Sequence, residues 1–168
     1  QPQHHRISMA GGSFSTEIEG VVIRGEGAWY DGKKFQSMNP QNENALTEKT
    51  YMHYLLGVDY IIGGVNVSGQ FIQQAIMNYD QDIRHDAHQN TMTFLANYDM
   101  FRETLNLELF SYIGMDDGDA LIRPKVTYDF DDGIEVLGGA NIFTGDREGQ
   151  FGQFRDNSMI YAKIKYSF

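Results

Sequence analysis

Residues 158–168, SMIYAKIKYSF, decide the fold class, because apolar and polar residues alternate there with a period of two up to the last residue. Ile160, Ile164 and Tyr166 fall on one side, and Lys163 and Lys165 fall on the other. This is the pattern of a β-strand that separates two environments of opposite polarity. Taken alone, the segment fits both a half-buried strand of a water-soluble sheet and a strand in a membrane.

The same alternation recurs along the whole chain. In 104–114, for example, Leu105, Leu107 and Leu109 alternate with Asn106 and Glu108. Each segment has about ten residues, which a tilted strand needs to cross a bilayer. Runs of about 18 apolar residues, which a spanning helix requires, do not occur, so a membrane-spanning form of this chain has to be a closed barrel. The other expected strands are 4–12, 20–30, 54–62, 65–74, 90–100, 121–130 and 134–143.

The connections between these segments differ in length in a regular way. Tight turns fit at 18–20, 63–64, 102–104 and 131–133, where glycine or polar turn residues stand. Longer polar stretches alternate with these turns at 31–50, 78–90, 115–119 and 144–158. Outer-membrane barrels have short turns on the periplasmic rim and long loops outside. We therefore expect the short turns and the C-terminus at the periplasmic rim.

Aromatic residues recur near the ends of the strands that run toward the short turns. On the outward side they form the periplasmic half of an aromatic girdle, and the last of them is also expected to be the assembly signal. The alternative is a water-soluble β-sandwich or a lipocalin-like barrel, whose aromatic side chains would face a core. The expected girdle residues are Tyr60, Tyr98, Tyr128, Phe130, Tyr166 and Phe168.

These patterns predict an all-β fold, an antiparallel transmembrane β-barrel forming a single domain over residues 1–168. If residues 1–12 are not a strand, eight strands close on themselves. If they are a strand, nine result, with the first and last running in the same direction, whereas bacterial single-chain barrels have an even number. The start, QPQHHRIS, also lacks the features of a signal peptide. We expect nine strands that form the C-terminal portion of a larger barrel, completed by sequence or a chain beyond this one.

Charged residues gather on the side opposite the outward residues. In a wide barrel they would line a water-filled lumen, and in a narrow one they would pair into an internal network of salt bridges; both interpretations stay open. Five are positive and six negative, which predicts no strong ion preference. The expected lumen-lining residues are Arg24, Glu26, Asp59, Asp99, Glu108, Arg123, Lys125, Asp129, Glu135, Lys163 and Lys165.

Composition excludes several functions. The chain has 13 Lys and Arg against 23 Asp and Glu, a net charge of -10 and no Cys, which argues against a nucleic-acid partner and rules out disulfides and cysteine metal sites. No motif of a serine hydrolase elbow, phosphate-binding loop, dinucleotide fold or zinc protease occurs. We expect no enzyme activity, cofactor or metal. We expect two groups of loop residues to be charged side chains exposed to solvent: Asp116, Asp117 and Asp119, and Asp82, His85, Asp86 and His88. His4 and His5 fit an exposed terminus.

The C-terminal YAKIKYSF, with Phe168 last and Tyr166 two before it, resembles the recognition signature of proteins that the outer-membrane assembly machinery inserts. Residues 12–30, GSFSTEIEGVVIRGEGAWY, and 152–168, GQFRDNSMIYAKIKYSF, resemble stretches of a proteobacterial barrel family of unknown function, often encoded near RND-type exporters. Its members are much longer, and the resemblance covers their C-terminal part. It implies an outer-membrane location and transport, and it supplies no catalytic residues.

Together these features predict a bacterial outer-membrane, porin-like barrel that allows or assists the passage of small solutes. The alternative is a non-conducting barrel with a structural or surface-interaction role. The expected partners are outer-membrane lipid and lipopolysaccharide, the assembly machinery during biogenesis, and further barrel strands or chains.

Overall fold

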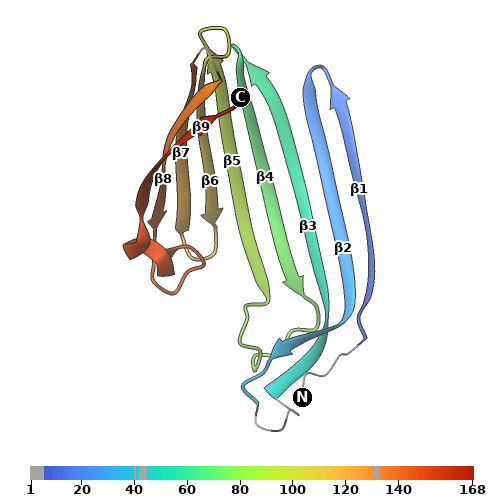
Figure 1. Cartoon of the computed structure of the whole chain (residues 1–168). Helices are drawn as coiled ribbons and strands as arrows, with labels where there is room; N and C mark the ends of the chain where they lie inside the picture. The colour runs from blue at the N-terminus through green and yellow to red at the C-terminus, as the bar shows by residue number, and fades with distance from the viewer. Residues whose placement is uncertain (1–5, 40, 42–44, 131–132) are drawn as a thin grey trace.

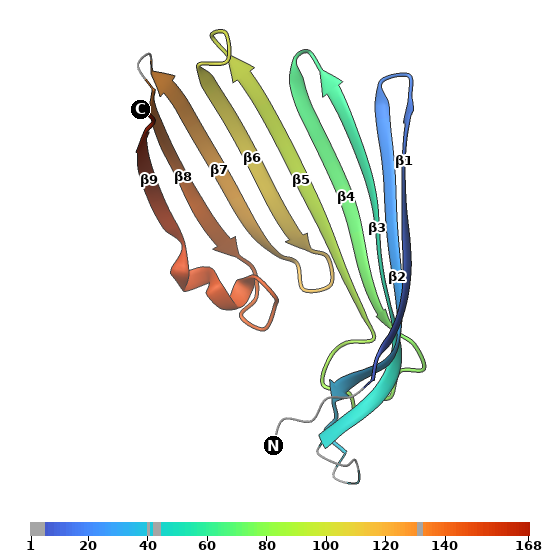
Figure 2. The ribbon, with the colours of Figure 1, turned by 45° about the vertical axis from the view of Figure 1, so that its right-hand side comes forward.

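The computed structural model describes residues 6–39, 41, 45–130 and 133–168. They form nine strands in one antiparallel sheet whose strand order is the chain order (Figures 1 and 2). This confirms the all-β antiparallel prediction and the count of nine. The strands are β1 (Ser8–Ile18), β2 (Val21–Gln36), β3 (Leu46–Ile62), β4 (Val65–Ile76), β5 (His88–Met100), β6 (Leu105–Gly114), β7 (Asp119–Phe130), β8 (Ile134–Thr144) and β9 (Met159–Tyr166).

The register joins the alternation of the separate strands into two continuous faces. Directly paired residues point to the same side of a sheet, and so do residues two apart on one strand. Leu107 pairs with Tyr98 on β5 and Val126 on β7, whereas its neighbour Glu108 pairs with Asn97 and Lys125. We call the side of Glu108 the polar face and the side of Leu107 the apolar face.

The sheet is open. Among the described residues, β1 pairs only with β2, and β9 only with β8. The expectation that eight strands might close alone is wrong, because residues 8–18 are a strand. The whole length of β1 pairs with residues 21–31 of β2. This first strand begins at Ser8 and runs to the turn at Glu19 and Gly20, and the expected start at residue 4 lies outside the described residues. Strands β1 and β9 run in the same direction (Figure 1).

The short turns lie at one end of the sheet together with the C-terminus, and the other connections lie at the opposite end (Figure 2). Gly63 and Gly64 both have positive φ, of 56° and 86°, which the tight β3–β4 hairpin requires. The stretch around Met115 to Gly118 is a four-residue turn, no longer than the turn from Phe101 to Thr104. The expectation of a longer loop there is therefore wrong.

Strands β2 and β3 extend well past the other strands at the loop end (Figure 2). Residues 31–36 and 46–50, which we expected in a loop, are paired strand, so only 37–45 connect them. Residues 88–90 belong to β5, and 152–157 form a 3-10 helix, η2 (Gly152–Asn157). Polar residues are therefore not confined to loops, because these strand extensions are polar as well.

A small core sits at this end, on the polar-face side. Phe35, Tyr51, Ile76 and Ile83 are buried together, with Tyr30 and Tyr79 packed against them. A bridge between Ser37 and Ile83 ties the β4–β5 connection to the end of β2. We call these six apolar and aromatic residues the rim core. They hold the long β2–β3 hairpin against the β4–β5 connection.

Candidate functional site

The eleven charged residues predicted to line a lumen all lie on the polar face, as the strand register shows. Four of them form two ion pairs between neighbouring strands: Arg24 with Asp59 at 3.0 Å, and Lys125 with Glu108 at 2.8 Å. Among the described residues, the other seven are in no ion pair. The polar face therefore combines ion-paired residues with charged residues that, within the described part of the chain, are in no ion pair.

Amide side chains form further hydrogen bonds on this face. Asn106 donates from Nδ2 to Asp99 at 2.7 Å and to Asn97 at 3.1 Å. Arg123 donates from Nε to Asn141 at 3.1 Å. A face lined with charge and amide groups in this way is suited to contact with water and polar solutes.

The residues predicted for the girdle fall on the apolar face, near the short turns. The ring of Tyr60 lies beside Gly20 and that of Tyr98 beside Gly64, both glycines of short turns. Phe168 follows β9, and its ring centroid lies 6.1 Å from that of Tyr166. The register puts Tyr128 on this face, and Phe130, two residues further along β7, shares it. These aromatic side chains gather at one end of the sheet.

A second polar and aromatic level lies at the other end of the apolar face, and the sequence analysis did not assign it. Tyr54 donates to Gln73 at 2.5 Å, Gln73 to Asn90 at 2.5 Å, and Asn90 to Asp116 at 2.8 Å. Trp29, 41% exposed, shares this face. The signal was present in the sequence, since Trp29 and Tyr54 both fall on the outward side.

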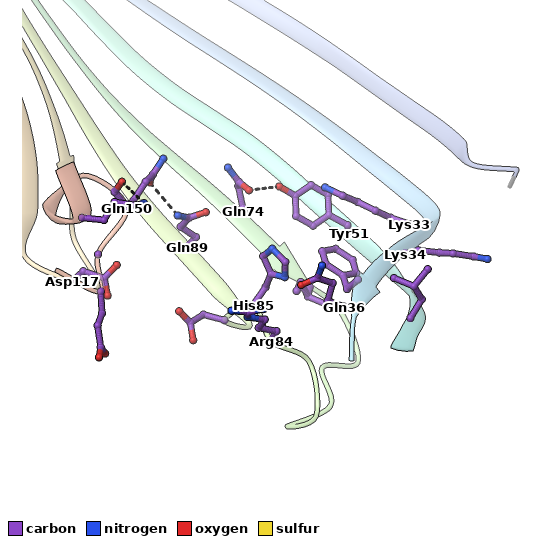
Figure 3. A pocket seen from close by; sticks show the side chains of 17 residues that line it. Lys33, Lys34, Gln36, Tyr51, Gln74, Arg84, His85, Gln89, Asp117 and Gln150 are labelled. Atoms are coloured by element: carbon purple, nitrogen blue, oxygen red, sulfur yellow. Dashed lines mark hydrogen bonds between the residues drawn. The ribbon is translucent and has the colours of Figure 1, made fainter. Parts of the chain in front are cut away.

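A cavity of about 780 Å³ opens on the polar face at the loop end. Figure 3 shows its residues coming from distant parts of the sheet: Lys33 and Tyr51 from β2 and β3, Gln89 from β5, and Gln150 from the β8–β9 loop. Strands that are several places apart at about 4.8 Å each line one cavity only if the sheet curves. The sheet therefore curves toward its polar face.

On one side of this cavity, the ammonium group of Lys33 packs against the rim core. A bulge between Tyr30 and Lys33, with Gly32 at φ 83°, shifts the register by one residue and brings Lys33 onto the same side as Tyr51. The Lys33 ammonium lies 3.5 Å from the centre of the Tyr51 ring and 5.3 Å from that of Phe35. Burial lowers the pKa of Lys33. Arg84 and His85 line the same side (Figure 3).

The opposite side is acidic, with Asp117 and Glu148 among the lining residues. Desolvation raises the pKa of Asp117, and the nearby carboxylates of Asp119, Asp86, Asp116 and Asp146 raise it further. The cavity therefore has Lys33, Arg84 and His85 toward the rim core and Asp117 and Glu148 on the other side, while Asp86, next to His85, is close enough to Asp117 to raise its pKa.

Asp119 corrects the prediction that the loop acids are solvated charge. It is the first residue of β7 and is 0% exposed. Its Oδ2 accepts hydrogen bonds from the backbone amides of Phe151 at 2.5 Å and Gly152 at 3.0 Å. Its burial depends on contacts with Phe151 and Gly152, about thirty residues further along the chain. The residues next to Asp119 in the sequence therefore did not predict it.

Three of the remaining loop residues have structural partners. Asp116 accepts from the backbone amide of Asn90, Asp82 accepts from Asn39, and His85 packs its edge against Phe35 at 6.0 Å between ring centres. Across the described ranges, no group of three or more His, Cys, Asp or Glu side chains is placed to hold a metal ion. The two N-terminal histidines, His4 and His5, lie outside the described residues.

Within the described part of the chain, no helix is long and apolar enough to cross a membrane. A comparison with protein-family models and with the sequences of curated proteins gave no match.

Proposed function

We propose that this sheet is part of a closed outer-membrane β-barrel that lets small solutes pass. The observation that carries the proposal is the distribution of polarity on a curved sheet. The face toward which the sheet curves is charged, and the outward face is apolar and exposed, with Leu56 at 52% and Ile164 at 74%. Water-soluble proteins bury such a face, because a continuous apolar surface of this extent is costly in water.

The dimensions of the apolar face support a membrane environment. Tyr98 belongs to the aromatic level and Asn90 to the polar level, and they are eight residue steps apart on β5. At about 3.4 Å per residue and a tilt of about 40°, this separation is roughly 21 Å in height. The apolar band of an outer-membrane barrel is about 25 Å tall. The two levels therefore fit the two interfaces of a membrane.

The two free edges support closure by further strands. Unpaired backbone groups in hydrocarbon cost several kcal/mol each, so a lipid-exposed sheet closes into a ring. Because β1 and β9 run in the same direction, a ring with only antiparallel pairs needs an odd number of additional strands. A ring made only of copies of this sheet would leave β9 beside β1 in parallel. We propose at least ten strands in all, wider than the eight whose interior side chains fill.

The outer-membrane location, with lipid, lipopolysaccharide and the assembly machinery as partners, is part of this proposal. Membership of the barrel family that residues 12–30 and 152–168 resemble is part of it too.

The alternative is a non-conducting barrel, favoured by the inward contacts of the β8–β9 loop. Ion current through planar bilayers separates the two. Reconstituted full-length protein should give discrete current steps, and insertion without current would leave the non-conducting barrel.

A further inference from the structure

The carboxylate of Asp119 is fully buried, yet it belongs to a residue anchored in the sheet by its pairing with Gly114. Removing a carboxylate from water is costly unless charged hydrogen bonds replace the lost hydration. For Oδ2 the replacement comes from the β8–β9 connection, residues 145–158, through the amides of Phe151 and Gly152, whereas Oδ1 is buried and has no hydrogen-bond partner among the described residues. A residue of the barrel wall thus binds the backbone of a loop.

The loop is shaped to reach this carboxylate. A Cβ atom at Gly149 would overlap the carboxylate of Asp119, and a Cβ at Gly114 would overlap it from the sheet side. Glycine removes both obstacles, so the backbone closes around the acid from two directions. Gly149 and Gly152 are themselves buried. The position of the loop is therefore specified by close packing around a single acid.

From this anchor the loop crosses the polar face toward earlier strands. Phe151 stacks on Tyr112 of β6, with ring centres 5.7 Å apart and an angle of 26° between the planes. Gln150 accepts a hydrogen bond from Gln89 of β5 at 3.0 Å. The loop thus leaves β8 and makes contacts on β6 and β5, over the face that would bound the lumen.

We propose that the β8–β9 loop is the constriction of the pore and that Asp119 is the positioning residue that holds it there; this inference rests on the proposed function. The loop contributes Gly149, Gln150 and Gln153 to one side of the 780 Å³ cavity, while Lys33 and Tyr51 form the other. A loop fixed over the inner face narrows the passage at this level. The gap between the loop and the rim core then sets the size of solute that passes.

The test compares Asp119→Ala and Asp119→Asn with Asp116→Ala in the full-length protein. Asp116 is the matched control, because it lies in the adjoining turn and also accepts a backbone amide hydrogen bond, from Asn90 on β5 rather than from the loop. Two readouts are measured: single-channel conductance, and the rate of tryptic cleavage after Arg147 and Arg155 within the loop. Cleavage after Arg84 in the β4–β5 connection serves as the internal reference.

Asp119→Ala should release the loop, so that cleavage after Arg147 rises roughly tenfold or more relative to Arg84, since each lost bond to a charged group favours the open state. Conductance should rise with it. Asp119→Asn keeps a neutral acceptor and should give a smaller increase in both readouts, which keeps the test valid if the alanine variant fails to fold. Asp116→Ala should leave the cleavage rate after Arg147 and the conductance near those of the parent protein.

Unchanged cleavage in both Asp119 variants would overturn the anchoring role, and faster cleavage with unchanged conductance would overturn the constriction. Neither result contradicts the proposed function, because the parent protein still conducts in both cases. Absence of current in the parent protein and in both Asp119 variants would refute the constriction together with the proposed passage. A silent parent and a conducting Asp119 variant would support a loop that closes the pore.

Discussion

Lys125 Nζ lies 2.8 Å from Glu108 Oε1, and the two residues face each other directly across the β6–β7 pair. Both side chains are about three-quarters shielded from solvent, with 28% and 27% exposed. Partly shielded pairs with fixed geometry are coupled more strongly than exposed ones. We expect a double-mutant cycle of Glu108→Gln and Lys125→Met, measured by unfolding in lipid, to give a coupling free energy of about 1 kcal/mol.

The exposed pair between Arg147 and Asp156 is the control for this cycle, because its atoms are 3.1 Å apart but 65% and 73% of the two side chains are exposed. Its coupling free energy should be below about 0.5 kcal/mol. Equal coupling in the two pairs would argue against a sheltered polar face.

The direction in which the proposed barrel spans the membrane is tested with single cysteines, since the chain has none of its own. Glu19 and Asn78 are matched, because both are exposed non-glycine turn residues with positive φ, of 52° and 49°, at opposite ends of the sheet. A membrane-impermeant maleimide on intact cells should label Asn78→Cys, whereas Glu19→Cys should react only after permeabilisation. The reverse labelling would invert the proposed topology.

Phe168 is tested as the assembly signal. It is fully exposed beyond β9, next to Tyr166 on the apolar side, so folding of the sheet itself does not explain an aromatic residue there. Its deletion should reduce the amount of protein inserted in the outer membrane far more than Lys163→Ala on the opposite face of β9. Fractionation and heat-dependent mobility on gels measure insertion. Similar insertion of the two variants would remove the proposed role.

The ion preference of the cavity should depend on pH through Asp117. Desolvation and neighbouring carboxylates raise its pKa, so as pH falls it takes up a proton before carboxyl groups with ordinary values near 3.9. Its negative charge is present above this raised pKa and lost below it. We expect cation preference, measured from reversal potentials, to fall in that pH range. In Asp117→Asn this step should be missing, and its persistence there would assign it to another acid.

The two faces of the sheet could be predicted from the sequence, because strand alternation is local. The alternation within β6 alone puts Leu107 and Glu108 on opposite sides of the strand. The register then aligns the apolar sides of neighbouring strands on one face of the sheet and the polar sides on the other. The same reasoning separated the aromatic residues near the short turns from the charged residues of the polar face. It also gave nine strands.

The site at the loop end could not be predicted in this way. Strict alternation puts Lys33 on the side opposite Tyr30, and only the bulge at Gly32 brings it over Tyr51. Asp119 stands in an acidic stretch that suggests solvent, and its burial depends on Phe151 and Gly152 folding back from a later connection. Both outcomes depend on contacts between segments that are distant in sequence.

Adjacent residues on β6 offer the most direct test of the central proposal, that the apolar face meets lipid and the polar face a watery lumen. Leu107 lies on the apolar face, and Asn106 lies on the polar face beside Asp99, with which an arginine could pair. Strand, depth and introduced charge are the same for Leu107→Arg and Asn106→Arg. Arginine on the lipid side near mid-membrane costs about 2–4 kcal/mol.

The measurement is the free energy of unfolding of the two variants in lipid vesicles. The account predicts that Leu107→Arg loses about 2–4 kcal/mol relative to the parent protein, while Asn106→Arg loses less than about 1 kcal/mol. Equal loss in the two variants, or greater loss in Asn106→Arg, would contradict the assignment of the faces and with it the proposed barrel.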